Sequence, residues 1–129
     1  MPVMSSLAPL VHAALRIMAA FVYLLHGLQK FGFLGGTAQP LASMLGAAAV
    51  IETGAGVLIL LGLFTRPAAF LASGQMAAAY LMAHLPRGVL PIQNGGDPAV
   101  LLCFVFLFIW AAGPGPWSLD ALRKGMSRS

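Results

Sequence analysis

The sequence feature that most constrains this chain is a single carboxylate inside a long apolar run. Residues 46–63 read GAAAVIETGAGVLILLGL, and Glu52 is the one charged residue among them. A run of this length and composition can form a membrane-spanning helix. An ionised side chain in hydrocarbon costs from about 3 to more than 10 kcal/mol, so it persists only where it is paired, protonated or facing a cavity. The rest of the chain must therefore supply a partner or a cavity for Glu52.

The composition places the whole chain in a bilayer. Charged residues make up 8% of the 129 residues and hydrophobic residues 60%, whereas soluble domains carry about 25% charged residues. The net charge of +4 comes from single Lys and Arg residues among apolar runs, which indicates topogenic charge rather than a surface for nucleic acid. Cys103 is the only cysteine, so the chain has no internal disulfide and no CxxC redox pair.

Four apolar segments predict an all-α fold, namely a polytopic membrane four-helix bundle in antiparallel up-down-up-down order. We expect residues 1–129 to form a single transmembrane domain, with spans at about 7–29, 43–63, 67–85 and 98–112 and a short C-terminal tail at 113–129. We expect the first apolar run to be a span rather than a cleaved signal peptide, because no charged segment precedes it. Asp97 and Ser118 are expected helix caps.

Four spans place both termini on the same side of the membrane. Basic residues are more numerous on the side of the termini and the middle connection than on the opposite side. The first group is Arg66, Arg123, Lys124 and Arg128, and the second is Lys30 and Arg87. Because basic residues are retained in the cytoplasm, we expect a multi-pass protein of a bacterial-type cytoplasmic (inner) membrane with both termini cytoplasmic.

Polar residues of the first span fall on one face. At 100° per residue, four of them lie within roughly 80° of Arg16; they are His12, Tyr23, His26 and Lys30. Counted from the expected helix ends, Arg16 lies roughly 13 Å and Glu52 roughly 15–18 Å from the same membrane edge. Because the planar guanidinium suits a carboxylate, we predict that Arg16 and Glu52 form an ion pair.

A second group of polar residues is expected near the opposite membrane edge. Counted from the expected helix ends, His26, Lys30 and His84 lie near this edge, beside a turn that contains Asn94. Tyr80 shares a helix face with His84. They form either a separate cluster or the mouth of one cavity that contains Glu52. We place Gln75 on the opposite face of the third span. The candidates for ligand binding or proton relay are Arg16, Tyr23, His26, Lys30, Glu52, Tyr80, His84 and Asn94.

These polar residues leave several kinds of site open. They could bind a ligand, or they could only fix the packing of the helices, as buried polar groups sometimes do. Two histidines and a glutamate could hold a metal, but the HxxxH and ExxH spacings are missing, so no metal site is predicted. No catalytic residue is identified.

Short motifs distributed over the four expected spans carry a resemblance. They are HGLQKFG at 26–32, ETG at 52–54, LGLFTRPAA at 61–69, NGGD at 94–97, and GPG with WSLD at 113–115 and 117–120. With this order and spacing, from about Arg16 to Asp120, the sequence resembles the DoxX family of small four-helix membrane proteins.

The resemblance implies a redox-associated membrane subunit. The family takes its name from a small subunit associated with a terminal quinol oxidase, and other members are assigned to thiosulfate:quinone oxidoreductases or to membrane assemblies for thiol stress. It implies association with a respiratory or thiol-related redox complex and a redox partner protein. It also implies a bound quinone or similar small amphipathic ligand. The sequence has no haem-attachment motif and no nucleotide-binding fingerprint, so no covalently bound cofactor is expected. Two alternatives stay open: a scaffold protein or homo-oligomer without ligand chemistry, and transport of a small solute or protons.

Overall fold

The computed structural model describes residues 2–40 and 42–128, with side chains for 5–40 and 42–124. Met1, Leu41 and Ser129, which belong to the expected domain, and the side chain of Arg128 lie outside this description. The described residues contain no strand, so the expected all-α fold is confirmed. The helices are α1 (Pro2–Lys30), α2 (Met44–Leu61), α3 (Thr65–Ala79), α4 (Pro91–Asn94), α5 (Asp97–Ala112) and α6 (Leu119–Arg128).

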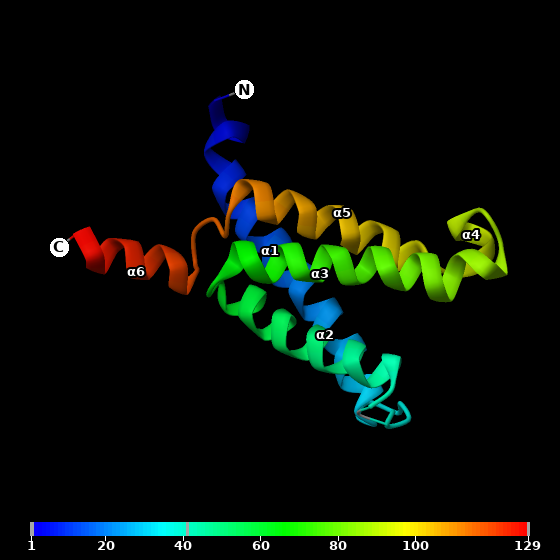
Figure 1. The fold of residues 1–129 in the computed structure, drawn as a ribbon. Helices are drawn as coiled ribbons and strands as arrows, with labels where there is room; N and C mark the ends of the chain where they lie inside the picture. Colours follow the sequence, from blue (N-terminus) through cyan, green and yellow to red (C-terminus); the bar gives the residue numbers. More distant parts are fainter. Residues whose placement is uncertain (1, 41, 129) are drawn as a thin grey trace.

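The long helices form two pairs. α1 packs along α2, α3 packs along α5, and α2 contacts α3, whereas α1 touches α5 only lightly. Figure 1 shows α2 and α3 meeting at the short turn between them and diverging toward the end that carries α4, while α6 projects beyond the opposite end. Residues 5–30 of α1 and all of α2 are long and apolar enough to cross a membrane. The helices α3 and α5, of 15 and 16 residues, are shorter than the roughly 20 residues of a typical span.

Two glycines let α1 and α2 approach closely around Glu52. A Cβ atom added at Gly27 would lie 2.9 Å from Cβ of Glu52 and 2.7 Å from Oγ1 of Thr53. At Gly56 the added atom would lie 3.2 Å from Cα of Leu24. Small residues at such points allow helix backbones to pack closely in lipid. The contact sets Glu52 level with the last two turns of α1.

Helix ends follow from local chemistry. The side chain of Ser43 accepts a hydrogen bond from the amide of Gly46 (3.0 Å) and caps α2, and the hydroxyl of Ser118 accepts from the amide of Ala121 (3.1 Å), as expected for α6. Gly62 ends α2 at φ 69°, where other residues are strained, and an added Cβ would also collide with Ser118. The expected cap at Asp97 is wrong: Gly96 takes that position and Asp97 is the first residue of α5.

The sequence predicted a continuous third helix, but the structure shows that this helix is interrupted. It is α-helical only to Ala79, followed by a π-helical turn η1 (Tyr80–His84) and a 3₁₀ turn η2 (Leu85–Arg87). A π-helical turn leaves the usual i to i−4 ladder and is frequent at functional sites. It shifts the face that His84 presents, which a constant 100° per residue does not anticipate.

The tail is fastened to the turn between α2 and α3 by Asp120. Its carboxylate accepts hydrogen bonds from the amides of Phe64 (3.0 Å) and Thr65 (2.9 Å), and its own amide donates to the carbonyl of Gly62 (2.8 Å). Phe64, the N-cap residue of α3, makes no side-chain capping bond. The carboxylate of α6 therefore caps α3 from outside and complements its positive end.

We expect the Asp120 contact to make the stability of the protein sensitive to acid. Partial burial works to raise the pKa of Asp120, but the hydrogen bonds from Thr65 and Phe64 and the charge of Arg123 outweigh it and lower the pKa below its ordinary value of 3.8. A lowered pKa in the folded state gives stability that is present above the ordinary value and lost as the pH falls through the lowered one. Thermal unfolding in detergent should therefore show a falling midpoint as the pH drops from about 5 to about 3.

The variant Asp120→Asn should lose about 1 kcal/mol at neutral pH, as caps typically do, and should flatten this acid dependence. The matched control is Asp97→Asn, whose carboxylate is exposed at the start of α5. An acid dependence that persists in Asp120→Asn would contradict the assignment.

Candidate functional site

The candidate site is a cavity of about 420 Å³ at the end where the two helix pairs diverge. Its walls come from the last turns of α1, the first half of α2, the second half of α3 with η1, and the start of α5. Most lining side chains are apolar, among them Leu45, Ile51, Met76 and Leu102. The polar lining residues are His26, Lys30, Glu52, Gln75 and His84.

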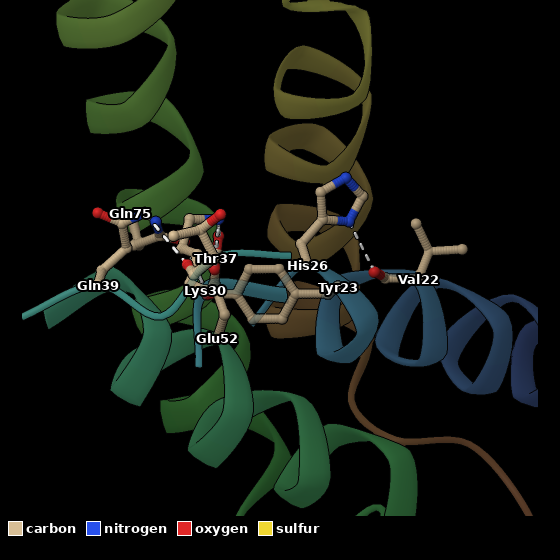
Figure 2. A network of polar contacts seen from close by, with 8 residues as sticks. All are labelled: Val22, Tyr23, His26, Lys30, Thr37, Gln39, Glu52 and Gln75. Carbon is tan, nitrogen blue, oxygen red and sulfur yellow. Dashed lines mark hydrogen bonds and ion pairs between the residues drawn. The ribbon is translucent and has the colours of Figure 1, made fainter. Parts of the chain in front are cut away.

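Glu52 is paired with Lys30, not with Arg16. The Nζ atom of Lys30 donates to Oε1 of Glu52 at 3.1 Å and lies 2.9 Å from Oε2. The side chain of Glu52 is 2% exposed and that of Lys30 is 24% exposed. A partly exposed lysine is therefore paired with a buried carboxylate. Figure 2 shows Lys30 and Glu52 meeting where α1 crosses α2.

The predicted pair fails because of the register between α1 and α2. The contact at Gly27 fixes Glu52 beside the C-terminal turns of α1. Arg16 lies 11 residues before Gly27, which is about 16 Å along a helix. The distances of Arg16 and Glu52 from the membrane edge, counted from the expected helix ends, did not include this offset between α1 and α2.

Arg16 instead binds the loop that precedes α6. It is fully buried, and its guanidinium donates to the carbonyl oxygens of Pro114, Pro116 (3.1 Å) and Trp117 (2.7 Å). The prolines remove amide donors from this loop, which leaves an excess of carbonyl acceptors, and arginine has five N–H donors to supply them. Arg16 does not line the cavity; it holds the C-terminal loop against α1.

Tyr23 contributes to the site through Gln75. Its hydroxyl donates to Oε1 of Gln75 at 2.9 Å, and its buried ring packs edge-on against Phe106 with ring centroids 4.9 Å apart. Since Oε1 is occupied, the amide group of Gln75 remains as a donor. The expected position of Gln75, on the opposite face of the third span, is wrong, because Gln75 lines the cavity with His84. The signal that could have found it is a carboxamide at the middle of an apolar helix, which requires a buried partner.

Both cavity histidines have the same fixed tautomer when neutral. Nδ1 of His26 lies 2.8 Å from the carbonyl oxygen of Val22, and Nδ1 of His84 lies 3.2 Å from that of Asn94. A carbonyl oxygen only accepts, so each neutral ring carries its proton on Nδ1 and keeps Nε2 as an acceptor. Figure 2 shows the contact of His26 with Val22. Each imidazole can thus accept a hydrogen bond through Nε2, or donate one when protonated.

Tyr80 and Asn94 build the loop over the end of α3. Nδ2 of Asn94 donates to the hydroxyl of Tyr80 (3.1 Å) and to the carbonyl of Gly88 (2.9 Å), while Oδ1 accepts from the amide of Gly96 (2.8 Å). The hydroxyl of Tyr80 donates to the carbonyl of Val89 (3.3 Å). Neither side chain lines the cavity, so their contacts position His84 rather than a ligand.

The structure thus brings together four of the eight candidates and supports one cavity containing Glu52 rather than a separate cluster. His26, Lys30, Glu52 and His84 line it, and Tyr23 joins through Gln75. Among the described residues, no three His, Cys, Asp or Glu side chains form a group that could hold a metal ion.

Comparison with known proteins settles the family. The sequence model of the DoxX family matches residues 11–85. The chain belongs to the DoxX family. The resemblance found in the motifs is thereby confirmed, and the apolar helices agree with a DoxX membrane protein.

Two bacterial relatives are similar over most of their length. An uncharacterized protein of Haemophilus influenzae is 42% identical over 116 residues, covering 84% of this chain and 87% of the relative. A protein of Mycobacterium tuberculosis, described as an uncharacterized membrane protein, is 32% identical over 127 residues, covering 82% of this chain and 77% of the relative. No solved structure matches the chain significantly.

The pairing of Lys30 with Glu52 can be tested by a double-mutant cycle. Lys30→Met should destabilise this DoxX protein by about 2 kcal/mol or more, because it leaves a buried carboxylate without its cation. The combination Lys30→Met with Glu52→Gln should be milder than the sum of the two single changes. The measurement is the unfolding free energy in detergent.

Arg16→Gln combined with Glu52→Gln is the matched control, and its effects should add, since the two residues are not partners. Additive losses for Lys30 and Glu52, or coupling between Arg16 and Glu52, would contradict the observed pairing.

Proposed function

We propose that this DoxX protein is a membrane subunit of a respiratory or thiol-related redox complex and binds a quinone, or a similar small amphipathic ligand, in its cavity. The observation that carries the proposal is the composition of the cavity: apolar walls with one buried ion pair, one free amide group and two imidazoles. Small-molecule sites typically occupy about 300–1,000 Å³ and have this combination of apolar walls and a few placed polar groups.

The polar groups match the chemistry of a quinone ring. Its carbonyl oxygens need donors, and the ammonium of Lys30 and the amide group of Gln75 are the donors that line the cavity. His26 and His84 offer Nε2 as an acceptor to a hydroxyl group of the reduced form, or as a donor when protonated. The apolar walls would cover the ring faces.

The edges of the cavity favour a ligand that arrives from the bilayer. Met44, Leu45 and Met82 line the cavity and are exposed in the isolated chain. In a membrane, an opening edged by such side chains faces hydrocarbon rather than water. A lipophilic ligand could enter there with its tail left among the lipids.

Electron transfer would depend on a partner protein. Cys103 is the single cysteine of the sequence and does not line the cavity, so thiol chemistry at the site is not part of the proposal. The role of this chain is to bind and orient the ligand without covalent attachment, and the partner's cofactor would exchange electrons with it.

The proposal includes four antiparallel spans in a bacterial inner membrane with both termini cytoplasmic. α3 continued through η1 and η2 extends from Thr65 to Arg87, which gives it the length of a span, and α5 is flanked by loops at both ends. The excess of basic residues near the turn between α2 and α3 and in α6 supports this orientation.

The direct test is binding of quinones to the purified protein. Organic extraction should recover a quinone from protein purified in mild detergent. Added short-chain ubiquinone or a menaquinone analogue should raise the unfolding midpoint, because a ligand at 100 times its Kd stabilises the folded state by about 2.7 kcal/mol. Ala48→Leu, which fills space in the cavity wall, should weaken binding by about tenfold or more.

The matched control is Ala111→Leu, an exposed position of α5 outside the cavity; it should bind as tightly as the unchanged protein. If no quinone is extracted and neither quinone changes the unfolding midpoint, the ligand proposal fails. The scaffold interpretation would then stand.

A further inference from the structure

The opposite end of the molecule has a second cavity, of about 620 Å³, which the proposed function does not use. It lies where the start of α3, the loop after α5 and the helix α6 meet. We call it the basic cavity. Its charged lining residues are Arg66, Arg123, Lys124 and Asp120.

The guanidinium of Arg66 lies against the backbone of Gly113 in the basic cavity. A Cβ atom added at Gly113 would lie 3.2 Å from Nη2 and 3.5 Å from Nε of Arg66. The guanidinium therefore rests against the backbone of Gly113, in space that a side chain there would take. Among the described side chains, no carboxylate forms an ion pair with Arg66. Its charge is therefore available to a ligand.

Arg123 faces the same space from α6. Its guanidinium stacks over the ring of Phe64, 4.9 Å from the centroid, and lies 3.9 Å from the carboxylate of Asp120. The side chain is 58% exposed. The ring of Phe64 thus orients a cation that Asp120 only partly neutralises.

The balance of charge favours an anion. Three cations and one carboxylate line the basic cavity. That carboxylate, Asp120, already accepts hydrogen bonds from the amides of Phe64 and Thr65. Its charge therefore stabilises the start of α3. Guanidinium groups are the side chains best suited to phosphate oxygens.

Exposed aromatic residues place the basic cavity at the level of the lipid headgroups. Trp117, between the lining residues Gly115 and Asp120, is 66% exposed, and Phe70, about one turn after Arg66 on α3, packs against Trp110 with ring centroids 5.4 Å apart. Aromatic residues of this kind collect at the boundary between hydrocarbon and water. Basic pockets at that depth bind anionic lipid headgroups.

We propose that the basic cavity binds the phosphate group of an anionic phospholipid, with Arg66 and Arg123 as its main contacts. The bound lipid would link α6 to the start of α3, adding to the contact that Asp120 already makes. This site is independent of the quinone proposal, because it lies at the other end of the molecule and shares no lining residue with the first cavity.

The experiment measures the unfolding midpoint of the full chain in detergent with added phosphatidylglycerol, phosphatidylcholine or inorganic phosphate. Phosphatidylglycerol should raise the midpoint in a saturable way and phosphatidylcholine should not. The double variant Arg66→Gln with Arg123→Gln should weaken the apparent affinity for phosphatidylglycerol by about tenfold or more, because it removes both guanidinium groups that attract the anionic headgroup.

Two further variants keep the test decisive. Ala121→Glu adds a carboxylate to the lining while retaining every cation, and it should also weaken phosphatidylglycerol binding. Arg87→Gln removes an exposed cation outside the cavity and should change nothing. An equal shift with inorganic phosphate would overturn the lipid as the ligand. A phosphatidylglycerol shift that survives the double variant and Ala121→Glu, or is lost equally in Arg87→Gln, would overturn the site.

Discussion

The structure depends on the burial of Glu52 next to the ammonium of Lys30. A carboxylate 2% exposed in an apolar helix is tolerable only with its charge compensated, and Lys30 compensates it from the last turn of α1. The close approach at Gly27 makes this possible, because it brings the two helices near enough for a lysine to reach the carboxylate. The pair, made possible by this register, places two charged groups in the lining of the cavity.

The two ends of the molecule are stabilised in different ways. At the end that carries α6, hydrogen bonds within the protein hold the helices together: Arg16 donates to the carbonyls of the proline-rich loop, and Asp120 caps α3. At the other end the helix pairs diverge (Figure 1), and His26 and His84, whose hydrogen bonds are made through Nδ1, line a cavity. The first end holds the helices together, and the second has unused hydrogen-bonding capacity for a ligand.

The π-helical turn η1 and the loop that follows it position His84 at the cavity. Tyr80 and Asn94 bind each other and the backbone of residues 88–96, and the backbone of Asn94 fixes the ring of His84. Two residues that sequence alone suggested as ligand contacts therefore act by positioning a third. The π-helical turn itself was not predicted from the sequence, because no residue type requires one.

The sequence by itself determined the membrane character, the all-helical fold, the DoxX family, the cap at Ser118, and the need for a partner for Glu52. Each of these follows from local composition, from motifs or from the energetic cost of a charge in hydrocarbon. Only the tertiary structure decided that the partner is Lys30, that Arg16 serves the C-terminal loop, and that Gln75 faces the cavity. Those outcomes depend on the register between helices, which close packing at Gly27 and Gly56 sets across the long connection between α1 and α2. Arg16 and Lys30 lie 14 residues apart on α1, which is about 21 Å along a helix, so the register between α1 and α2 decides which of the two meets Glu52.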